Sequence, residues 1–257
     1  MSTGSAVAAS LLVVGALVGA GVLVSQPEED TRVRPAPFWG LRGAEQPLPA
    51  ETGGHGAGTS YVVAEVEGPT IAVHPSPDSA TKPTHLRNPN EVGAPRVFLA
   101  LEAEGDWLKV QVPVRPNAST GWIKRSDVVL KATPYRIRVA LGKRELSLFR
   151  GNELVMREPV GVGKSVTATP KGLYYVTELL EPPDPNGAYG SYAFGTSAFS
   201  EVLTDFAGGD GVVGIHGTND PSSIGKDVSH GCIRLSNAAV TRMAGMLPLG
   251  TPVYITA

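Results

Sequence analysis

The chain has 257 residues, 42% of them hydrophobic and 18% charged, which suffices for one large domain or two small ones with ordinary cores. Its net charge is -2 and no basic stripe is available to pair with phosphates, so the composition argues against a nucleic-acid partner. A single cysteine, Cys232, excludes an intramolecular disulfide and leaves a thiol that is either reactive or incidental.

Residues 6–24 form a run of 19 residues without a charge. A run of this length can span a bilayer, and it lacks the polar face that a buried core helix would have. The small residues Val18, Gly19 and Ala20 are also compatible with a signal-peptide cleavage site. We therefore expect residues 1–25 to be a signal peptide or a membrane anchor, with membrane contact through residues 6–24 and an extracytoplasmic mature chain.

Residues 26–60 are rich in Pro, Gly, Ala, Glu and Thr and have no apolar periodicity. Such a composition buries too little apolar surface to fold, so a flexible linker is predicted. The linker ends where the first run of β-branched residues begins, at Tyr61.

Residues 61–131 contain five runs rich in β-branched and aromatic residues. Turn signals with Gly, Pro, Asn and Asp separate the runs, and this spacing predicts a small β-barrel. The segments GDWLKVQVP and TGWIKRSDV resemble bacterial SH3-like modules, and Trp107 and Trp122 carry that resemblance. Both tryptophans are expected in the core rather than in a ligand groove, because aromatic side chains dominate cores. The predicted strands are 61–66, 70–74, 97–101, 107–112 and 121–130.

Residues 132–257 are predicted to form a second, mainly β domain. Only one segment has helical features: Ser236 or Asn237 can cap a helix over 238–247. The segment Glu181 to Gly211 is long and irregular, and such loops in compact domains are usually lids or binding loops. The strand-like runs are 136–141, 145–150, 153–162, 172–180, 212–216 and 251–257.

The chemistry-bearing residues cluster around the single cysteine. His216 lies 16 positions before Cys232, and His230 lies two positions before it. A free thiol is mostly protonated at neutral pH, and an imidazole within hydrogen-bond reach can take its proton and stabilise the thiolate. The backbone carbonyl of Gly217 can fix the tautomer of His216. Gly231 permits a tight turn that presents backbone N–H groups as an oxyanion hole.

Two other interpretations of this cluster are open from the residues alone. A zinc site could use His216, His230, Cys232 and either Asp220 or Asp227, but the spacing matches none of the common zinc motifs. A buried, inert cysteine between two ordinary histidines is the second, because buried cysteine often has no chemical role. The compact His-Gly-Cys-x-Arg grouping, with a second histidine upstream, favours a nucleophile over both.

The stretches HGTNDPSSIG and VSHGCIRLSN resemble the catalytic domain of the L,D-transpeptidase family, also called the YkuD domain. The family signature is a histidine followed, after a gap, by Ser/Thr-His-Gly-Cys-hydrophobic-Arg/Asn, and every position is matched here. The similarity extends to PVGVGKSVTATPKGLYYV and covers about residues 134–257. It implies a YkuD-type β-sandwich with one or two short helices over residues 132–257, behind an SH3-like domain over residues 61–131.

Carried over residue by residue, the resemblance implies that Cys232 is the nucleophile and His216 its proton donor and acceptor. It also implies that the Gly217 backbone orients His216 and that backbone amides around Gly231 stabilise the oxyanion. For the aromatic residues of the flap, packing of the loop on itself is an equal alternative. The implied substrate-binding residues are Ser229, His230 and Arg234 in the acyl-donor pocket and Tyr189, Tyr192 and Phe194 in the flap.

The resemblance further implies an L,D-transpeptidase that forms 3→3 peptidoglycan cross-links. The thiolate attacks the third residue of a tetrapeptide stem, which is a diamino acid, and releases the terminal D-Ala. An amine of another stem then resolves the thioester. The implied partners are donor and acceptor stem peptides, with a carbapenem as covalent inhibitor, and no metal or organic cofactor takes part. The implied location is outside the cytoplasm, membrane-anchored or secreted to the cell wall.

Three related functions fit the same residues. Water could resolve the thioester, which gives an L,D-carboxypeptidase, or a lysine of a wall-bound protein could do so, which attaches that protein to peptidoglycan. A catalytically silent domain would leave a wall-binding protein. A papain-like endopeptidase does not fit, because its histidine follows the cysteine and none of the 25 residues after Cys232 is histidine.

Overall fold

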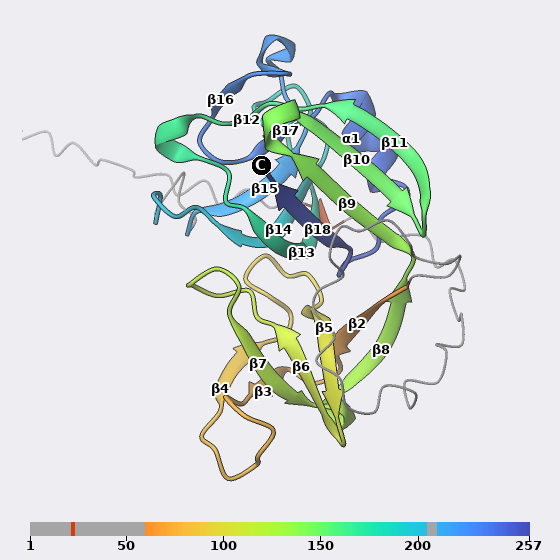
Figure 1. The fold of residues 1–257 in the computed structure, drawn as a ribbon, viewed down its shortest axis with the longest axis vertical. Coiled ribbons are helices and arrows are strands. Elements are labelled where there is room, and N and C mark those ends of the chain that lie inside the picture. The colour runs from red at the N-terminus through yellow and green to blue at the C-terminus, as the bar shows by residue number, and fades with distance from the viewer. Residues whose placement is uncertain (1–21, 24–59, 205–209) are drawn as a thin grey trace, which may run out of the picture.

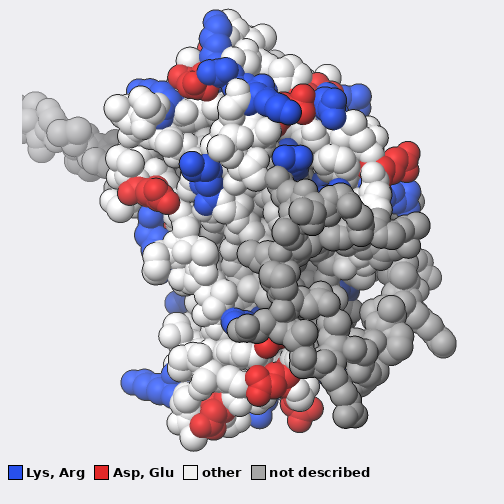
Figure 2. Space-filling view, viewed as in Figure 1, with Lys and Arg blue, Asp and Glu red and all other residues white. Residues whose placement is uncertain are grey.

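The computed structural model describes residues 22–23, 60–204 and 210–257, which form two β bodies stacked along the long axis of the molecule (Figure 1). Residues 60–133 make the first body and residues 135–257 the second. The fold of these residues is mainly β with one α-helix, which confirms the predicted fold class at this level. On the face seen in Figure 2, acidic and basic side chains are interspersed.

The predicted N-terminal segment 1–25 and the linker 26–60 lie outside the described residues, apart from strand β1 (Val22–Leu23) and Ser60. Strand β1 pairs antiparallel with Leu180 and Glu181 of the second body. Within the described ranges, no helix is long and apolar enough to cross a membrane.

The first body is a five-stranded antiparallel sheet with a two-stranded hairpin. Apolar side chains from both, among them Ala64, Ile71 and Phe98, pack into one core. A bridge between His74 and Trp122 joins the hairpin to the sheet, and the likeness to an SH3-like barrel stays a prediction. The sheet order is β7-β6-β5-β2-β8, from β2 (Tyr61–Val66), β5 (Val97–Glu104), β6 (Trp107–Gln111), β7 (Thr120–Lys124) and β8 (Val128–Thr133), with hairpin β3 (Thr70–Val73) and β4 (Thr84–Arg87).

The second body is built on one long sheet of the order β11-β10-β9-β18-β13-β14-β15-β17, to which β1 adds at β13. Its helix, α1 (Asn237–Ala244), begins at Ser236, whose hydroxyl caps the amide of Ala239. The strands are β9 (Tyr135–Ala140), β10 (Glu145–Arg150), β11 (Glu153–Pro159), β13 (Gly172–Glu181), β14 (Ala193–Phe199), β15 (Val212–His216), β17 (Ile233–Arg234) and β18 (Pro252–Thr256), and a small parallel pair joins β12 (Val162–Gly163) to β16 (Asp227–Ser229).

The sheet has one buried face and one partly open face where β13, β14, β15 and β17 lie side by side. Leu179, Phe194, Ile215 and Ile233 are paired in register across these strands and are at most 2% exposed. Helix α1 packs into the same core through Val240 and its neighbours. Because successive side chains of a strand point to opposite faces, the residues next to these four face away from the core.

The first body docks on that second face of β13. Tyr175 is fully buried against Val63, Val97 and Leu99 of the first body. Asn117 adds a two-way contact with the backbone of Phe199: its amide donates to the carbonyl oxygen and its carbonyl accepts from the N–H, both at 2.8 Å. The two bodies therefore share buried apolar side chains and directional hydrogen bonds.

The prediction that the segment from Glu181 to Gly211 is irregular is wrong in part. It contains strand β14, which lies inside the sheet between β13 and β15. The sequence AFGTSAF hides this strand because small and polar residues interrupt its apolar pattern. The Thr196 hydroxyl is buried but satisfied, since it donates to the carbonyl oxygen of Val213 at 2.5 Å. Irregular backbone remains before and after β14, with residues 205–209 outside the description.

Candidate active site

The cysteine sits at the end of a tight loop that runs from Ser229 to Cys232. Ser229 is 1% exposed, and its hydroxyl donates to the Cys232 carbonyl oxygen at 2.6 Å and accepts from the Gly231 N–H at 3.1 Å. Gly231 has a φ of 123°, which lies in a region that favours glycine. One buried hydroxyl therefore closes the loop and sets the direction in which Cys232 leaves it.

Two threonines hold the loop from outside. The Thr167 hydroxyl donates to the Ser229 carbonyl oxygen at 3.2 Å, and the Thr169 hydroxyl donates to the Gly231 carbonyl oxygen at 2.8 Å. Both threonines are buried and both lie some 60 residues before the loop. Sequence reasoning missed them because no local motif links a threonine to a backbone carbonyl so far along the chain.

His216 ends strand β15 and is 5% exposed. Its Nδ1 lies 2.6 Å from the carbonyl oxygen of Gly217, and the donor there is the ring N–H because a carbonyl only accepts. That contact leaves Nε2 as the nitrogen free to take a proton. The tautomer that a general base requires is thus set by the next residue along the chain, at the position predicted from the sequence.

The ring of His216 and the sulfur of Cys232 both lie next to Gly214. The Gly214 N–H donates to Cys232 Sγ at 3.4 Å. A Cβ placed on Gly214 would lie 3.8 Å from His216 Cδ2, the ring carbon next to Nε2. Parallel pairing of Ile215 with Ile233 fixes this arrangement, because it sets the β15 and β17 chains side by side. Gly214 leaves the space between ring and sulfur free of a side chain.

Burial sets the protonation states of the pair. Desolvation lowers the pKa of His216 to about 4, against a smaller raising effect of its bond to Gly217 and with a further lowering by the Arg234 charge. Desolvation also raises the pKa of the Cys232 thiol, although the Gly214 hydrogen bond and Arg234 oppose this. At neutral pH the resting pair is therefore a neutral thiol beside a neutral imidazole, and the proton has to move when the sulfur attacks.

Arg234 is the cation nearest in register to the pair. It is paired with His216 across β15 and β17, and its backbone exchanges hydrogen bonds with Gly161. Its Nε is buried and has no hydrogen-bond partner among the described residues. An unsatisfied buried donor costs free energy, so this group is available to an acceptor atom brought by a ligand.

The loop before β14 carries Tyr189 over the histidine. The two rings meet edge to face with centroids 4.9 Å apart, and Tyr189 remains 44% exposed. The loop is anchored at Gly190, where an added Cβ would lie 2.1 Å from Asn237 Oδ1 and 2.6 Å from Gly217 Cα. Asn237 Oδ1 in turn accepts the Thr218 N–H at 3.0 Å, so the first residue of α1 ties the tyrosine loop to the histidine loop.

The other predicted site residues fall at different places. Phe194 is fully buried in the core, on the opposite face of the sheet from His216, so its predicted place in the substrate flap is corrected. Tyr192 packs against the same core and its carbonyl accepts from Gly217 N–H at 3.1 Å. The Gly231 amide is engaged by Ser229, so the predicted oxyanion role cannot rest on that N–H. His230 is exposed at the rim, where its substrate role stays a prediction.

The residues of the alternative zinc interpretation do not converge. Within the described ranges, no three side chains of His, Cys, Asp or Glu form a group that could hold a metal ion. Asp220 instead caps the turn Pro221–Ser223, and Asp227 pairs with Arg144 at 2.7 Å. The site is thus a thiol, an imidazole and a guanidinium on one partly open sheet face.

Comparison with known proteins places this arrangement in a family. Residues 134–255 match the model of the YkuD domain, the L,D-transpeptidase catalytic domain. Over 140 residues the chain is 35% identical to the putative L,D-transpeptidase YqjB of Bacillus subtilis (strain 168), which covers 49% of this chain and 73% of that protein. The chain belongs to the L,D-transpeptidase family.

Two further similarities were found. Over 123 residues the chain is 42% identical to the putative L,D-transpeptidase YkuD of Bacillus licheniformis, a match that covers 48% of this chain and 66% of that protein, just under two thirds of its length. Among solved structures, an L,D-transpeptidase from Mycobacterium smegmatis is 17% identical with a TM-score of 0.37, and the match covers 59% of this chain and 90% of that chain.

Proposed function

We propose that the protein is a cysteine-dependent L,D-transpeptidase that forms 3→3 cross-links in peptidoglycan through a thioester on Cys232. The observation that carries the proposal is that the Cys232 thiol and the His216 ring both lie next to Gly214, on the partly open face of the sheet. Membership of the L,D-transpeptidase family supports the reaction class, and the geometry supports the thiol as the nucleophile.

Acylation begins from the neutral pair. Nε2 of His216 takes the thiol proton as Sγ attacks the carbonyl carbon of the third residue of a tetrapeptide stem. The imidazolium then gives this proton to the amine of the departing D-Ala. The Nδ1–H bond to Gly217 holds the ring in place while its charge changes. Because burial disfavours the charged imidazole, proton transfer and carbon–sulfur bond formation are expected to be concerted.

The thioester is then attacked by an amine of a second stem, which gives the cross-link and restores the thiol. Arg234 is the residue we assign to the donor stem, because its buried Nε lacks a partner in the part of the chain that the structure describes and a substrate carbonyl or carboxylate would supply one. Tyr189, whose ring meets the His216 ring edge to face, would cover the reacting atoms from the solvent side. The oxyanion is assigned to backbone amides next to the sulfur other than that of Gly231.

The test is intact-protein mass spectrometry after incubation with a tetrapeptide stem and, separately, with a carbapenem. The parent protein is expected to gain a covalent adduct on Cys232 in both cases, while Cys232→Ala gains none and keeps its thermal unfolding temperature. His216→Asn should slow acylation by about 100-fold to 10,000-fold, the usual contribution of a general base. A folded parent protein that forms no adduct with either compound would exclude the proposal.

The products decide how the thioester is resolved. Analysis of muropeptides after digestion is expected to show 3→3 linked dimers. Tripeptides alone would indicate water as the acceptor, and a stem attached to a protein lysine would indicate protein anchoring. We also propose an extracytoplasmic location, supported by the uncharged run over residues 6–24, and fractionation of cells that express the full chain tests it.

A further inference from the structure

A carboxylate lies on the same sheet face as the catalytic pair. Glu178 on β13 is paired with Gly195 on β14, and Gly195 is paired with Gly214 on β15. The Gly214 N–H in turn donates to Cys232 Sγ. Leu179, the neighbour of Glu178, points into the core, so Glu178 points to the face that carries the thiol. Glutamate, two glycines and cysteine therefore form one row across the sheet.

The two glycines keep this row open. A Cβ on Gly195 would lie only 1.9 Å from Glu178 Oε1 and 2.4 Å from its Cδ, so the carboxyl group occupies the space above Gly195. Gly214, the next position in the row, is partly exposed. Neighbouring strands are about 4.8 Å apart, which puts the carboxylate within about 10 Å of the sulfur. Neither glycine places a side chain between them.

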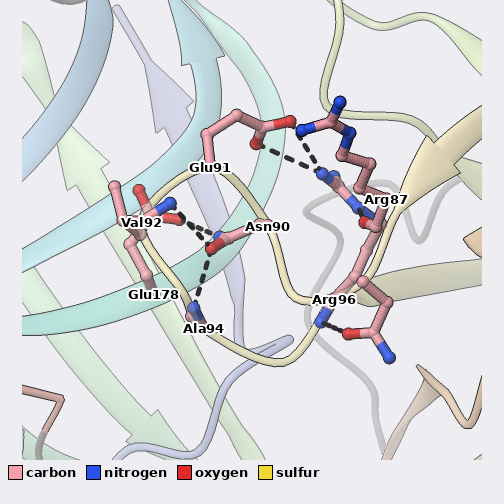
Figure 3. A network of polar contacts seen from close by, with 8 residues as sticks. Arg87, Asn90, Glu91, Val92, Ala94, Arg96 and Glu178 are labelled. Atoms are coloured by element: carbon pink, nitrogen blue, oxygen red, sulfur yellow. Dashed lines mark hydrogen bonds and ion pairs between the residues drawn. The ribbon is translucent and has the colours of Figure 1, made fainter. Parts of the chain in front are cut away.

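Within the described ranges, hydrogen bonds rather than an ion pair hold the Glu178 carboxylate. The Asn90 side-chain amide, from the first body, donates to Glu178 Oε2 at 2.9 Å (Figure 3). The nearby guanidinium of Arg96 is paired with Glu91 at 3.0 Å instead. No Lys or Arg within the described ranges forms an ion pair with Glu178. Burial raises the pKa of this carboxyl and the Glu91 charge adds to the rise, while hydrogen bonds with Thr177 and Asn90 and the charge of Arg96 oppose it.

Burying a carboxylate without an ion pair is costly even with hydrogen bonds to it and the Arg96 charge nearby, and a cationic ligand would offset that cost. The second half of the proposed reaction brings such a ligand. An alkyl amine carries a positive charge at neutral pH and cannot attack a thioester until it has lost a proton. A carboxylate within about 10 Å of the sulfur can hold the ammonium group and take its proton before the nitrogen moves onto the thioester carbon.

Resting on the proposed function, we propose that Glu178 binds the ammonium group of the acceptor stem and takes its first proton. The released amine nitrogen attacks the thioester carbon, so that a C–N bond forms as the C–S bond breaks. A second proton passes from nitrogen through His216 to the departing Sγ, and the third stays on the new amide. Glu178 then returns its proton to water. Asn90 holds the carboxylate in place, so the first body helps to build the acceptor subsite.

The experiment follows the fate of the acyl-enzyme in three variants. Glu178→Gln removes the charge but keeps an oxygen that can accept from Asn90 and the shape that fits above Gly195. Gly195→Ala keeps the charge and displaces the carboxyl group. Glu181→Gln is the matched control, because Glu181 is an exposed carboxylate on the same strand. The acyl-enzyme is made with a tetrapeptide stem and is captured either by Nα-acetyl-lysinamide, a cation, or by hydroxylamine, which is uncharged at neutral pH.

Acylation of Cys232 and capture by hydroxylamine are expected to match the parent protein in both test variants. Capture by Nα-acetyl-lysinamide should fall about tenfold or more, the loss that corresponds to one charged contact, and Glu181→Gln should not change it. Unchanged capture of the cationic amine in Glu178→Gln would overturn the inference. A parallel loss of acylation, hydroxylamine capture and thermal stability would also overturn it, since Glu178 would then only dock the two bodies. Gly195→Ala decides the question if Glu178→Gln does not fold, and a parent protein without an acyl-enzyme rejects the proposed function instead.

Discussion

Ser229 donates to the carbonyl oxygen of Cys232 at 2.6 Å and so connects the nucleophile to the start of its own loop. The hydroxyl also accepts the Gly231 N–H, so one side chain satisfies two backbone groups of the loop. Ser229 therefore helps to set the position of a sulfur that it does not touch.

Replacement of Ser229 by alanine is expected to destabilise the protein and to slow acylation. It leaves a buried carbonyl and a buried N–H without a partner, which costs about 1–3 kcal/mol. Chemical denaturation measures the loss of stability, and the rate of adduct formation with a carbapenem measures the displacement of the sulfur. Ser119→Ala is the control, because that hydroxyl makes a similar bond to the Pro116 carbonyl at an exposed position. Equal effects of the two substitutions would contradict the role given to Ser229.

Tyr189 packs edge to face on the His216 ring, and two substitutions separate the effect of its ring from that of its hydroxyl. Tyr189→Phe keeps the edge-to-face contact and should acylate at about the parent rate, since such ring pairs are worth about 0.5–1.5 kcal/mol. Tyr189→Ala exposes the imidazole and should raise its pKa, because burial is what lowers it. The measurement is the pH dependence of acylation, in which the acid limb should move to higher pH in Tyr189→Ala only.

The core of the active site could be predicted from sequence because its members are close along the chain. Ser229, Gly231, Cys232 and Arg234 lie within six positions, and the Gly217 carbonyl follows directly after His216. The alternation of side chains in VVGIH also predicts which residues share a face of the sheet. Val213 and Ile215 face the core, so Gly214 must share a face with His216.

The rest of the site could not be predicted because strand pairing creates it. Thr167, Thr169 and Glu178 reach the loop or its sheet face only after segments far apart in sequence are placed side by side. Strand β14 was missed for a related reason. A central strand whose outer face packs closely against a neighbouring carboxyl group needs small residues such as Gly195, and small residues weaken the apolar pattern by which strands are recognised. The same error placed Phe194 in a flap.

The contact between Asn117 and Phe199 should couple the unfolding of the two bodies. Asn117→Ala removes two hydrogen bonds to the backbone of β14 and should lower stability by about 1–3 kcal/mol. Differential scanning calorimetry of the full chain is expected to show one transition in the parent protein and a broader or split transition in the variant. Asn186→Ala serves as the control, since Asn186 lies in an exposed turn of the second body. An unchanged single transition in Asn117→Ala would mean that the contact between Asn117 and Phe199 is not needed to couple the two bodies.

The lowered pKa of His216 affects both activity and stability, and the two effects appear at different pH. Acylation needs the neutral imidazole, so its rate should be flat near neutral pH and fall about tenfold per pH unit only below pH 4. No rise from thiol ionisation is expected until well into the alkaline range, because burial raises the pKa of Cys232.

For stability, the unfolded chain binds a proton on this histidine near pH 6.5 while the folded protein does not until about pH 4. The free energy of unfolding should therefore decrease as the pH falls between these values, by up to about 3 kcal/mol from this group alone, and should not depend on it above pH 6.5. Urea denaturation of the parent protein and of His216→Asn across this range isolates the contribution. The pH dependence of the free energy of unfolding should differ between the parent protein and His216→Asn only below pH 6.5. A difference confined to higher pH would show that the buried ring is charged in the folded state.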